Sequence, residues 1–197
     1  MRSRTGPELG SRCERCALRP CACDLLSPLP VSTRFVVLRH VREAAKSSNS
    51  ARWATLLVPG CELRTWAGRP DAAAHRDLGR PGDCLLFPEG GAVPQPGSPG
   101  AVPERVVVLD GTWRQVRRML RALPAVQRLP RLSLGPRAPR VRLRAPPGPG
   151  YLSTLEAIAG AVALLEGEAL GRALEERHRA VIARARAARG WGLTEAA

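Results

Sequence analysis

The sequence predicts an α/β fold in which a parallel sheet is flanked by helices. Short apolar, β-branched runs alternate along the chain with longer segments of helical periodicity, and this alternation is typical of parallel sheets. The clearest run covers residues 106–109, and a helical pattern follows it through Leu123. An apolar run bounded by turn residues is expected for a strand that is buried on both faces.

Length and charge narrow the class of protein. The 197 residues suit one compact domain with a small appendage, and the 44% of hydrophobic residues argues against wholesale disorder. The net charge of +14 favours a polyanionic partner, nucleic acid first and an anionic membrane second. No apolar run approaches the ~20 residues of a membrane span, and the N-terminus lacks a signal-peptide core. We therefore expect a cytoplasmic protein without a membrane partner, and no protein partner can be inferred.

Four cysteines near the N-terminus have the spacing of a metal site. They are Cys13, Cys16, Cys21 and Cys23. A Cys-x-x-Cys turn directs two thiolates at one ion, and a zinc ion held by four protein ligands is structural because no position stays open. The alternatives are a disulfide pair or free thiols. Cys61 and Cys84 stand alone and are expected to be small buried apolar residues. We expect a basic N-terminus with a zinc-binding cluster over residues 1–30 and a catalytic domain over residues 31–197.

The first expected strand, over residues 34–39, leads into a polar loop. The loop carries His40, Arg42, Lys46, Asn49 and Arg52. Its basic side chains suit phosphate binding, although a solvated loop with a capping Asn or Ser explains the same residues. A helix is expected from residue 50 to residue 57, because Pro59-Gly60 would stop it.

The remaining elements follow from the same patterns. Strands are expected at residues 61–66 and 84–88, a flexible loop at 90–103, the strand at 106–109 with its helix, short strands at 131–134 and 141–144, and helices at 153–165 and 168–189. Ser153 and Glu156 have capping-box spacing, which is a structural explanation for both.

The turn after the strand at 106–109 carries the strongest functional signal. Asp110 stands at the carboxyl end of an expected parallel strand, where open α/β sheets place ligands. Thr112 can cap the next helix, and Trp113 offers a flat apolar wall. Equally, Asp110 can be an ordinary turn residue and Trp113 a core residue. No dinucleotide-binding or phosphate-loop glycine motif and no nucleophile elbow is present. The pattern by itself indicates a basic α/β protein with a zinc knuckle that acts on RNA or DNA.

The ordered set of motifs resembles the DTW-domain family. The matching residues are the four-cysteine cluster, His40 with Glu43, Asn49-Ser50-Ala51-Arg52, Leu86-Phe87-Pro88, Asp110-Gly111-Thr112-Trp113, Arg144 before a proline, and Ser153-Thr154-Leu155-Glu156-Ala157. The chain departs from the family pattern at Val41, where a proline is expected, and at Val141, where an aromatic residue is usual. These departures bear on fine substrate contacts.

The resemblance implies a tRNA-uridine aminocarboxypropyltransferase with a SPOUT-like, knotted fold. Such enzymes move the 3-amino-3-carboxypropyl group of S-adenosylmethionine to ring nitrogen 3 of a tRNA uridine, and methylthioadenosine leaves. Asp110 would be the catalytic base or a positioning group. The residues implied to bind S-adenosylmethionine are Leu86, Pro88, Thr112, Trp113, Ser153, Thr154 and Glu156; those implied to contact tRNA are His40, Arg42, Lys46, Asn49, Arg52 and Arg144. Zinc would be structural.

Two other functions fit the same motifs. One is an RNA methyltransferase of the same superfamily, which would leave a methyl group on the RNA. The other is a nonenzymatic, zinc-containing RNA-binding module, which would have no affinity for S-adenosylmethionine. The sequence leaves open which tRNA and which uridine would be modified, and the oligomeric state.

Overall fold

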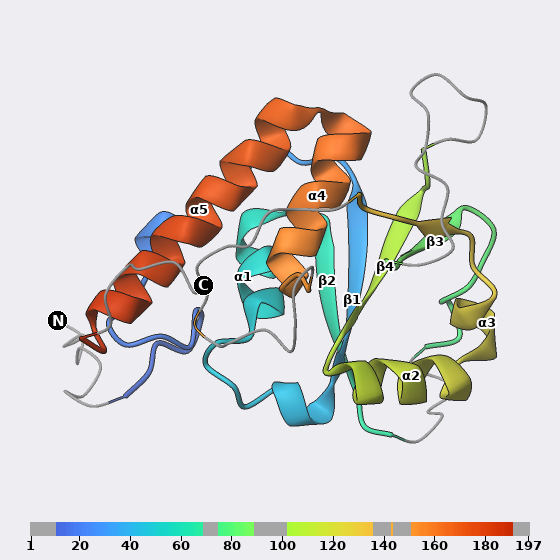
Figure 1. Ribbon diagram of the computed structural model, residues 1–197, viewed down its shortest axis with the longest axis horizontal. Coiled ribbons are helices and arrows are strands. Elements are labelled where there is room, and N and C mark those ends of the chain that lie inside the picture. The colour runs from blue at the N-terminus through green and yellow to red at the C-terminus, as the bar shows by residue number, and fades with distance from the viewer. Residues whose placement is uncertain (1–10, 69–74, 89–101, 136–142, 144–150, 191–197) are drawn as a thin grey trace, which may run out of the picture.

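The computed structural model describes residues 11–68, 75–88, 102–135, 143 and 151–190 (Figure 1). Its elements are η1 (Cys23–Leu25), β1 (Arg34–His40), η2 (Val41–Glu43), α1 (Ser50–Leu57), β2 (Cys61–Trp66), β3 (Asp83–Leu86), β4 (Arg105–Asp110), α2 (Trp113–Ala122), α3 (Pro124–Gln127), β5 (Arg131–Leu132), α4 (Thr154–Glu166) and α5 (Glu168–Ala187). The α/β class predicted from the sequence is confirmed.

The strands form one parallel sheet in the order β2-β1-β4-β3-β5. All four strand pairs are parallel. The central pair, β1 and β4, runs from Arg34 opposite Arg105 to Arg39 opposite Asp110. The carboxyl ends of these two strands therefore lie side by side.

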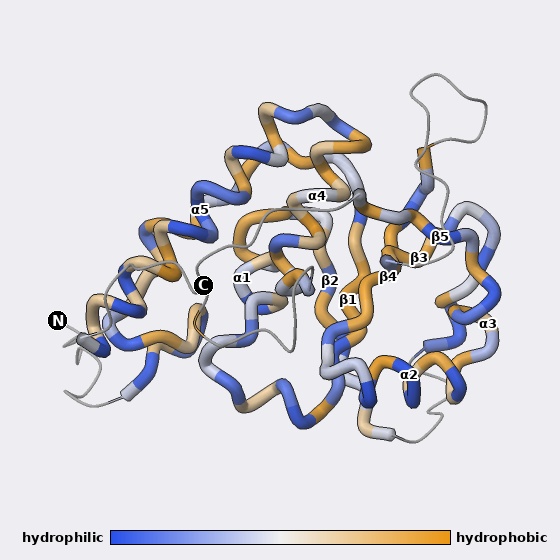
Figure 2. Tube along the Cα trace, viewed as in Figure 1, coloured by the Kyte–Doolittle hydropathy of each residue, from blue (hydrophilic) through white to orange (hydrophobic). Residues whose placement is uncertain are grey.

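Helices cover both faces of the sheet, which explains why the central strands β1 and β4 have apolar interiors (Figures 1 and 2). On one face, Phe35, Val37, Val106 and Val108 pack with residues of α1, α4 and α5. On the other face, Val36, Leu38 and Val107 pack with residues of α2 and α3. Successive residues of one strand thus serve two separate cores, because their side chains alternate between the faces.

Several boundaries differ from the expected ones. The helix expected through Leu123 ends at Ala122 as α2, and a short helix that was not expected, α3, begins at Pro124, which cannot continue the hydrogen bonding of α2. The strand expected at 131–134 covers only β5. The strand expected at 141–144 and the loop at 90–103 lie largely outside the described residues. The cap of α4 is as predicted: Ser153 and Glu156 form a capping box.

The cysteine segment packs against the sheet domain and α5. Cys16 and Leu18 belong to the same core as the strands. The indole nitrogen of Trp53 in α1 donates to the carbonyl of Cys16 at 2.9 Å. Arg184 of α5 binds both carboxylate oxygens of Asp24 and the carbonyl of Cys21. The segment is therefore anchored by apolar burial, a hydrogen bond and an ion pair. The expected division at residue 30 stays a prediction.

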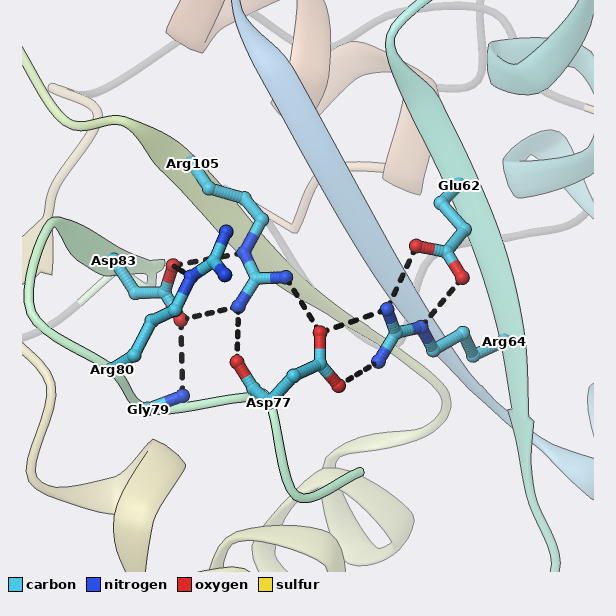
Figure 3. A network of polar contacts seen from close by, with 7 residues as sticks. All are labelled: Glu62, Arg64, Asp77, Gly79, Arg80, Asp83 and Arg105. Atoms are coloured by element: carbon cyan, nitrogen blue, oxygen red, sulfur yellow. Dashed lines mark hydrogen bonds and ion pairs between the residues drawn. The ribbon is translucent and has the colours of Figure 1, made fainter. Parts of the chain in front are cut away.

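A network of charges lies at the amino-terminal edge of the sheet, with the pair of Asp83 and Arg105 buried and Asp77 and Glu62 exposed (Figure 3). Arg105 of β4 donates to both carboxylate oxygens of Asp83 at 2.8 and 2.7 Å, and to Asp77 at 2.8 Å. Arg64 of β2 joins Asp77 to Glu62. Hydrogen bonds from Arg64 hold the pKa of Asp77 well below its usual range. The network connects β2, β3 and β4 on the face covered by α2.

We expect Asp83→Ala to lower the free energy of unfolding by about 3–5 kcal/mol, because Arg105 would keep a buried charge that has lost its main partner. The side chains of Asp83 and Arg105 are 0% and 7% exposed. Arg80→Ala is the matched control, since Arg80 is half exposed and 3.9 Å from Asp83, and should cost less than about 1 kcal/mol. Urea unfolding measures both variants. Equal, small losses would contradict a structural role for the network.

Candidate functional site

The candidate site lies where β1 and β4 end. The connection after β1 leads to α1, on one face of the sheet, whereas the connection after β4 leads to α2, on the other face. Neighbouring parallel strands whose connections diverge in this way open a crevice at their carboxyl ends, where α/β proteins bind ligands. Asp110 is the last residue of β4 and lies opposite Arg39 of β1. The topology therefore places Asp110 at the expected position for a ligand site.

Asp110 is buried and held by two side chains from distant parts of the chain. Asn49 Nδ2 donates to its Oδ2 at 2.6 Å, and Thr154 Oγ1 donates to its Oδ1 at 2.5 Å. Burial raises the pKa of Asp110, although the hydrogen bonds from Thr154 and Asn49 favour the charged form. A carboxylate fixed at both oxygens has a defined orientation, and a raised pKa makes it a stronger base than an exposed Asp.

The two partners of Asp110 stand at helix N-termini. Asn49 precedes α1 and makes no side-chain cap, because its amide is directed to Asp110. Thr154 is the first residue of α4. A hydrogen bond from the backbone nitrogen of Leu155 to Ser50 Oγ, 3.3 Å long, ties the two helix starts together. The positive ends of both helix dipoles therefore favour a negative charge near Asp110.

Arg39 is a site residue that the sequence reasoning missed. It is 9% exposed, and its Nη2 donates to Thr65 Oγ1 at 3.2 Å. Its Nε and Nη1 are buried without a partner among the described residues, as is Oδ1 of Asn49. Burial lowers the pKa of Arg39, with a contribution from Arg52. Buried hydrogen-bond donors normally have acceptors. The Nε and Nη1 groups of Arg39 can therefore donate to oxygen atoms of a bound substrate. The sequence signal that could have identified it is an arginine at the end of an apolar strand.

Aromatic side chains gather beside the turn after β4. The ring of Trp113 meets those of Phe87 and Tyr151 edge to face, with both centroid distances 5.6 Å. Arg131 lies over the ring of Phe87 at 4.7 Å. Phe87 and Tyr151 were not predicted as site residues. The cluster offers flat apolar surface of the kind that a nucleobase packs against.

Among the other residues expected to bind S-adenosylmethionine, Thr112, Ser153 and Glu156 have structural roles as helix caps. Leu86 is buried at the end of β3, and Pro88 is exposed just after it. Thr112 forms a capping box with Gln115 at the start of α2. Ser153 and Glu156 are occupied with each other in the cap of α4, which leaves Thr154 as the residue of that group that contacts Asp110.

The residues expected to contact RNA lie in different settings. His40 is buried, and its Nδ1 accepts a hydrogen bond from the backbone nitrogen of Arg42. Burial, and to a smaller extent the charge of Arg42, lowers the pKa of His40, so its ring is neutral at pH 7. Arg42 is exposed. Lys46 pairs with Glu43 at 2.5 Å. Arg52 donates to the backbone carbonyls of Glu14 and Ala44, and so joins the cysteine segment to the loop after β1. Arg144 lies outside the described residues.

The four clustered cysteines could hold a metal ion. Their sulfur atoms all lie within 4.8 Å of one another. The sulfurs of Cys13 and Cys23 are 3.6 Å apart, and those of Cys16 and Cys21 are 3.9 Å apart. Four sulfurs at ~2.3 Å from one tetrahedral ion would be about 3.8 Å apart, whereas a disulfide bond is ~2.05 Å long. A backbone hydrogen bond from Cys16 lowers the pKa of Cys13 to about 6, whereas burial raises the pKa of Cys23. A bound metal ion would favour the thiolate form of all four cysteines. Cys61 and Cys84 are buried apart from this cluster, as predicted.

Comparison with known proteins identifies a family and a curated relative of this chain. The DTW domain matches residues 10–186. The Drosophila melanogaster protein "tRNA-uridine aminocarboxypropyltransferase 2" is 34% identical over 173 residues, which cover 81% of this chain and 68% of the fly protein. No solved structure matches the chain significantly. Among the described residues, no helix is both long enough and apolar enough to cross a membrane.

Proposed function

This chain belongs to the DTW domain family, and we propose that it is a tRNA-uridine aminocarboxypropyltransferase. The proposed reaction moves the 3-amino-3-carboxypropyl group of S-adenosylmethionine to ring nitrogen 3 of a tRNA uridine and releases methylthioadenosine. The similarity to the fly tRNA-uridine aminocarboxypropyltransferase extends over most of this chain and supports the proposal.

The observation that carries the proposal is the buried Asp110 at the meeting point of β1 and β4. Its two oxygens are fixed by Asn49 and Thr154, and Arg39 beside it keeps two buried donors without a partner. An acidic group next to unpartnered donors suits a substrate that must lose a proton and whose oxygens then carry negative charge. The uracil imide is such a group, because carbonyl oxygens flank its ring nitrogen 3.

The residues of the candidate site would have different roles in the proposed reaction. The sulfonium of S-adenosylmethionine supplies an electrophilic carbon, and the carbon that lies in line with the nucleophile decides which group is transferred. Trp113, Leu86 and Pro88 would hold the adenine, and Thr112 and Thr154 the ribose or the amino-acid moiety. Asp110 would accept the proton from the uridine, or orient the uridine for attack. Arg39 would bind a substrate oxygen that becomes negative during the transfer.

The four-cysteine cluster is proposed to hold a structural zinc ion. Its donors fit zinc because four thiolates complete a tetrahedron and leave no position for a substrate. The SPOUT-like knot and the cytoplasmic location expected from the sequence stay predictions.

Nucleoside mass spectrometry tests the proposed reaction. Unmodified bulk tRNA, incubated with the protein and S-adenosylmethionine, is expected to yield a uridine heavier by one aminocarboxypropyl group and an equal amount of methylthioadenosine. The control reaction omits S-adenosylmethionine. A methylated nucleoside with S-adenosylhomocysteine would overturn the proposed chemistry in favour of methyl transfer. Binding of tRNA without affinity for S-adenosylmethionine would favour a nonenzymatic RNA-binding protein.

A further inference from the structure

The outer side of α2 is a row of exposed arginines. Residues 113–128, which cover α2 and α3, contain five arginines and no Asp or Glu. Arg114, Arg117, Arg118 and Arg121 of α2 are all exposed, as is Arg128. Within the described residues, none of the five has an ion pair. By contrast, Arg64, Arg105 and Arg184 are paired with carboxylates.

Helix geometry places these arginines opposite the core. At about 100° per residue, the four arginines of α2 occupy an arc of about 100° on one side of the helix. Val116, Met119 and Leu120 occupy the other side and pack under the sheet. The resulting change between hydrophobic and hydrophilic residues along α2 is visible in Figure 2. Because its apolar side is already buried, α2 has no apolar face to insert into a membrane.

The arginine row leads to the candidate site. α2 begins at Trp113, three residues after Asp110. Arg118 lies near enough to His40 to contribute to the lowering of its pKa, after burial and Arg42. Arg42 is exposed at the end of β1. Positive charge on α2 therefore lies close to positive charge at the end of β1, beside the candidate site.

We propose that the arginine row of α2 (Arg114, Arg117, Arg118 and Arg121) binds the sugar-phosphate backbone of the tRNA substrate and positions it over Asp110. This inference rests on the proposed function for the identity of the polyanion. Arginine binds phosphate in a bidentate manner and remains charged at every physiological pH. A helix surface that carries four exposed arginines can neutralise several phosphates along one strand and release their counterions.

A matched pair of double variants tests the proposal by binding alone. The double variant Arg117→Gln/Arg121→Gln removes two charges from the row. It leaves Arg114 and Arg118, the two arginines nearest the candidate site, unchanged. Arg172→Gln with Arg179→Gln removes two exposed charges from α5, on the other side of the sheet. Both variants lower the net charge by two, and glutamine preserves helix propensity. Circular dichroism and affinity for S-adenosylmethionine should be unchanged in both.

The expected result is a weaker and less salt-dependent complex for the α2 variant only. Its affinity for an unmodified tRNA transcript should fall about tenfold or more, and the slope of log K against log salt should decrease by about 2. The α5 variant should stay within about twofold of the wild type. Equal behaviour of the two variants would overturn the proposal, and so would an equal loss of binding to duplex DNA. Because the assay needs no turnover, failure of the proposed reaction would appear separately, as tRNA binding without a modified uridine.

Discussion

Asp110→Asn is expected to lower the rate of aminocarboxypropyl transfer by about 10²–10⁴-fold while the protein stays folded. The substitution removes the negative charge and the ability to accept a proton, but it preserves shape. Asn49 can adapt, because its Oδ1 is buried without a partner and its amide can rotate to accept from the new amide. The two helix starts would then remain joined through Ser50 and Leu155.

The pKa of Asp110 also fixes the sign of two pH effects. Because burial raises this pKa, the carboxylate becomes protonated at a higher pH than an exposed Asp does. The rate of a reaction that needs the carboxylate should therefore begin to fall at that higher pH as the solution is acidified. The effect on the free energy of unfolding has the opposite sign. The folded state binds the proton of Asp110 more tightly than the unfolded state does, so the free energy of unfolding rises as the pH falls through the pKa of the folded state. Asp110→Asn should therefore not lower the melting temperature.

Rates, pH profiles and melting temperatures of the two proteins check this prediction. Glu176→Gln is the control, because Glu176 is an exposed carboxylate on α5, and it should retain normal activity. A correctly folded Asp110→Asn protein with near-normal turnover would contradict any catalytic role. An unchanged turnover number with a raised KM would indicate that Asp110 only binds substrate.

Removal of the proposed zinc ion is expected to lower the stability of the protein strongly. Structural zinc binds thiolate sites with apparent free energies of about 10–16 kcal/mol in small peptides. Here the cysteine segment also contributes Cys16, Leu18, Ala22 and Leu26 to the main core. We expect Cys16→Ser, or exhaustive chelation, to lower the free energy of unfolding by about 3–5 kcal/mol. In a chain of this size each kcal/mol lowers the melting temperature by ~2–4 °C, so the melting temperature should fall by about 10 °C or more.

Elemental analysis and thermal melts measure this effect. Fresh protein should contain one zinc per chain, and added chelator should lower its melting temperature. Cys84→Ala, which alters a buried thiol outside the cluster, should keep the zinc. Substoichiometric zinc together with disulfide-bonded cluster cysteines would refute the metal site.

The local features of the fold could be read from the sequence because short-range physics decides them. The apolar runs became strands, Thr112 and Ser153 became helix caps, and Asp110 came to the carboxyl end of a strand. In each case the determining residues lie within a few positions of one another. The cysteine cluster is local in the same sense, since its four ligands fall within eleven positions.

The contacts that make the site depend on residues far apart in the chain. Asn49 and Thr154 are 61 and 44 positions from Asp110, and no periodicity relates them. The burial of Arg39 follows from the position of β1 between β2 and β4, which strand patterns do not specify. The contacts of Arg52 with the cysteine segment depend on how that segment docks, and the sequence instead suggested RNA binding.

The anchoring of the cysteine segment to α5 has a consequence for the order of events on the ribosome. Asp24 and its partner Arg184 are 160 positions apart. At about 5–20 residues per second, the α5 side of this contact emerges about 8–32 s after the cysteines. The four thiols could bind the proposed zinc ion early, because they are neighbours in sequence, and the segment could contact α1 early through Trp53. Its contact with α5 forms only after Arg184 has emerged.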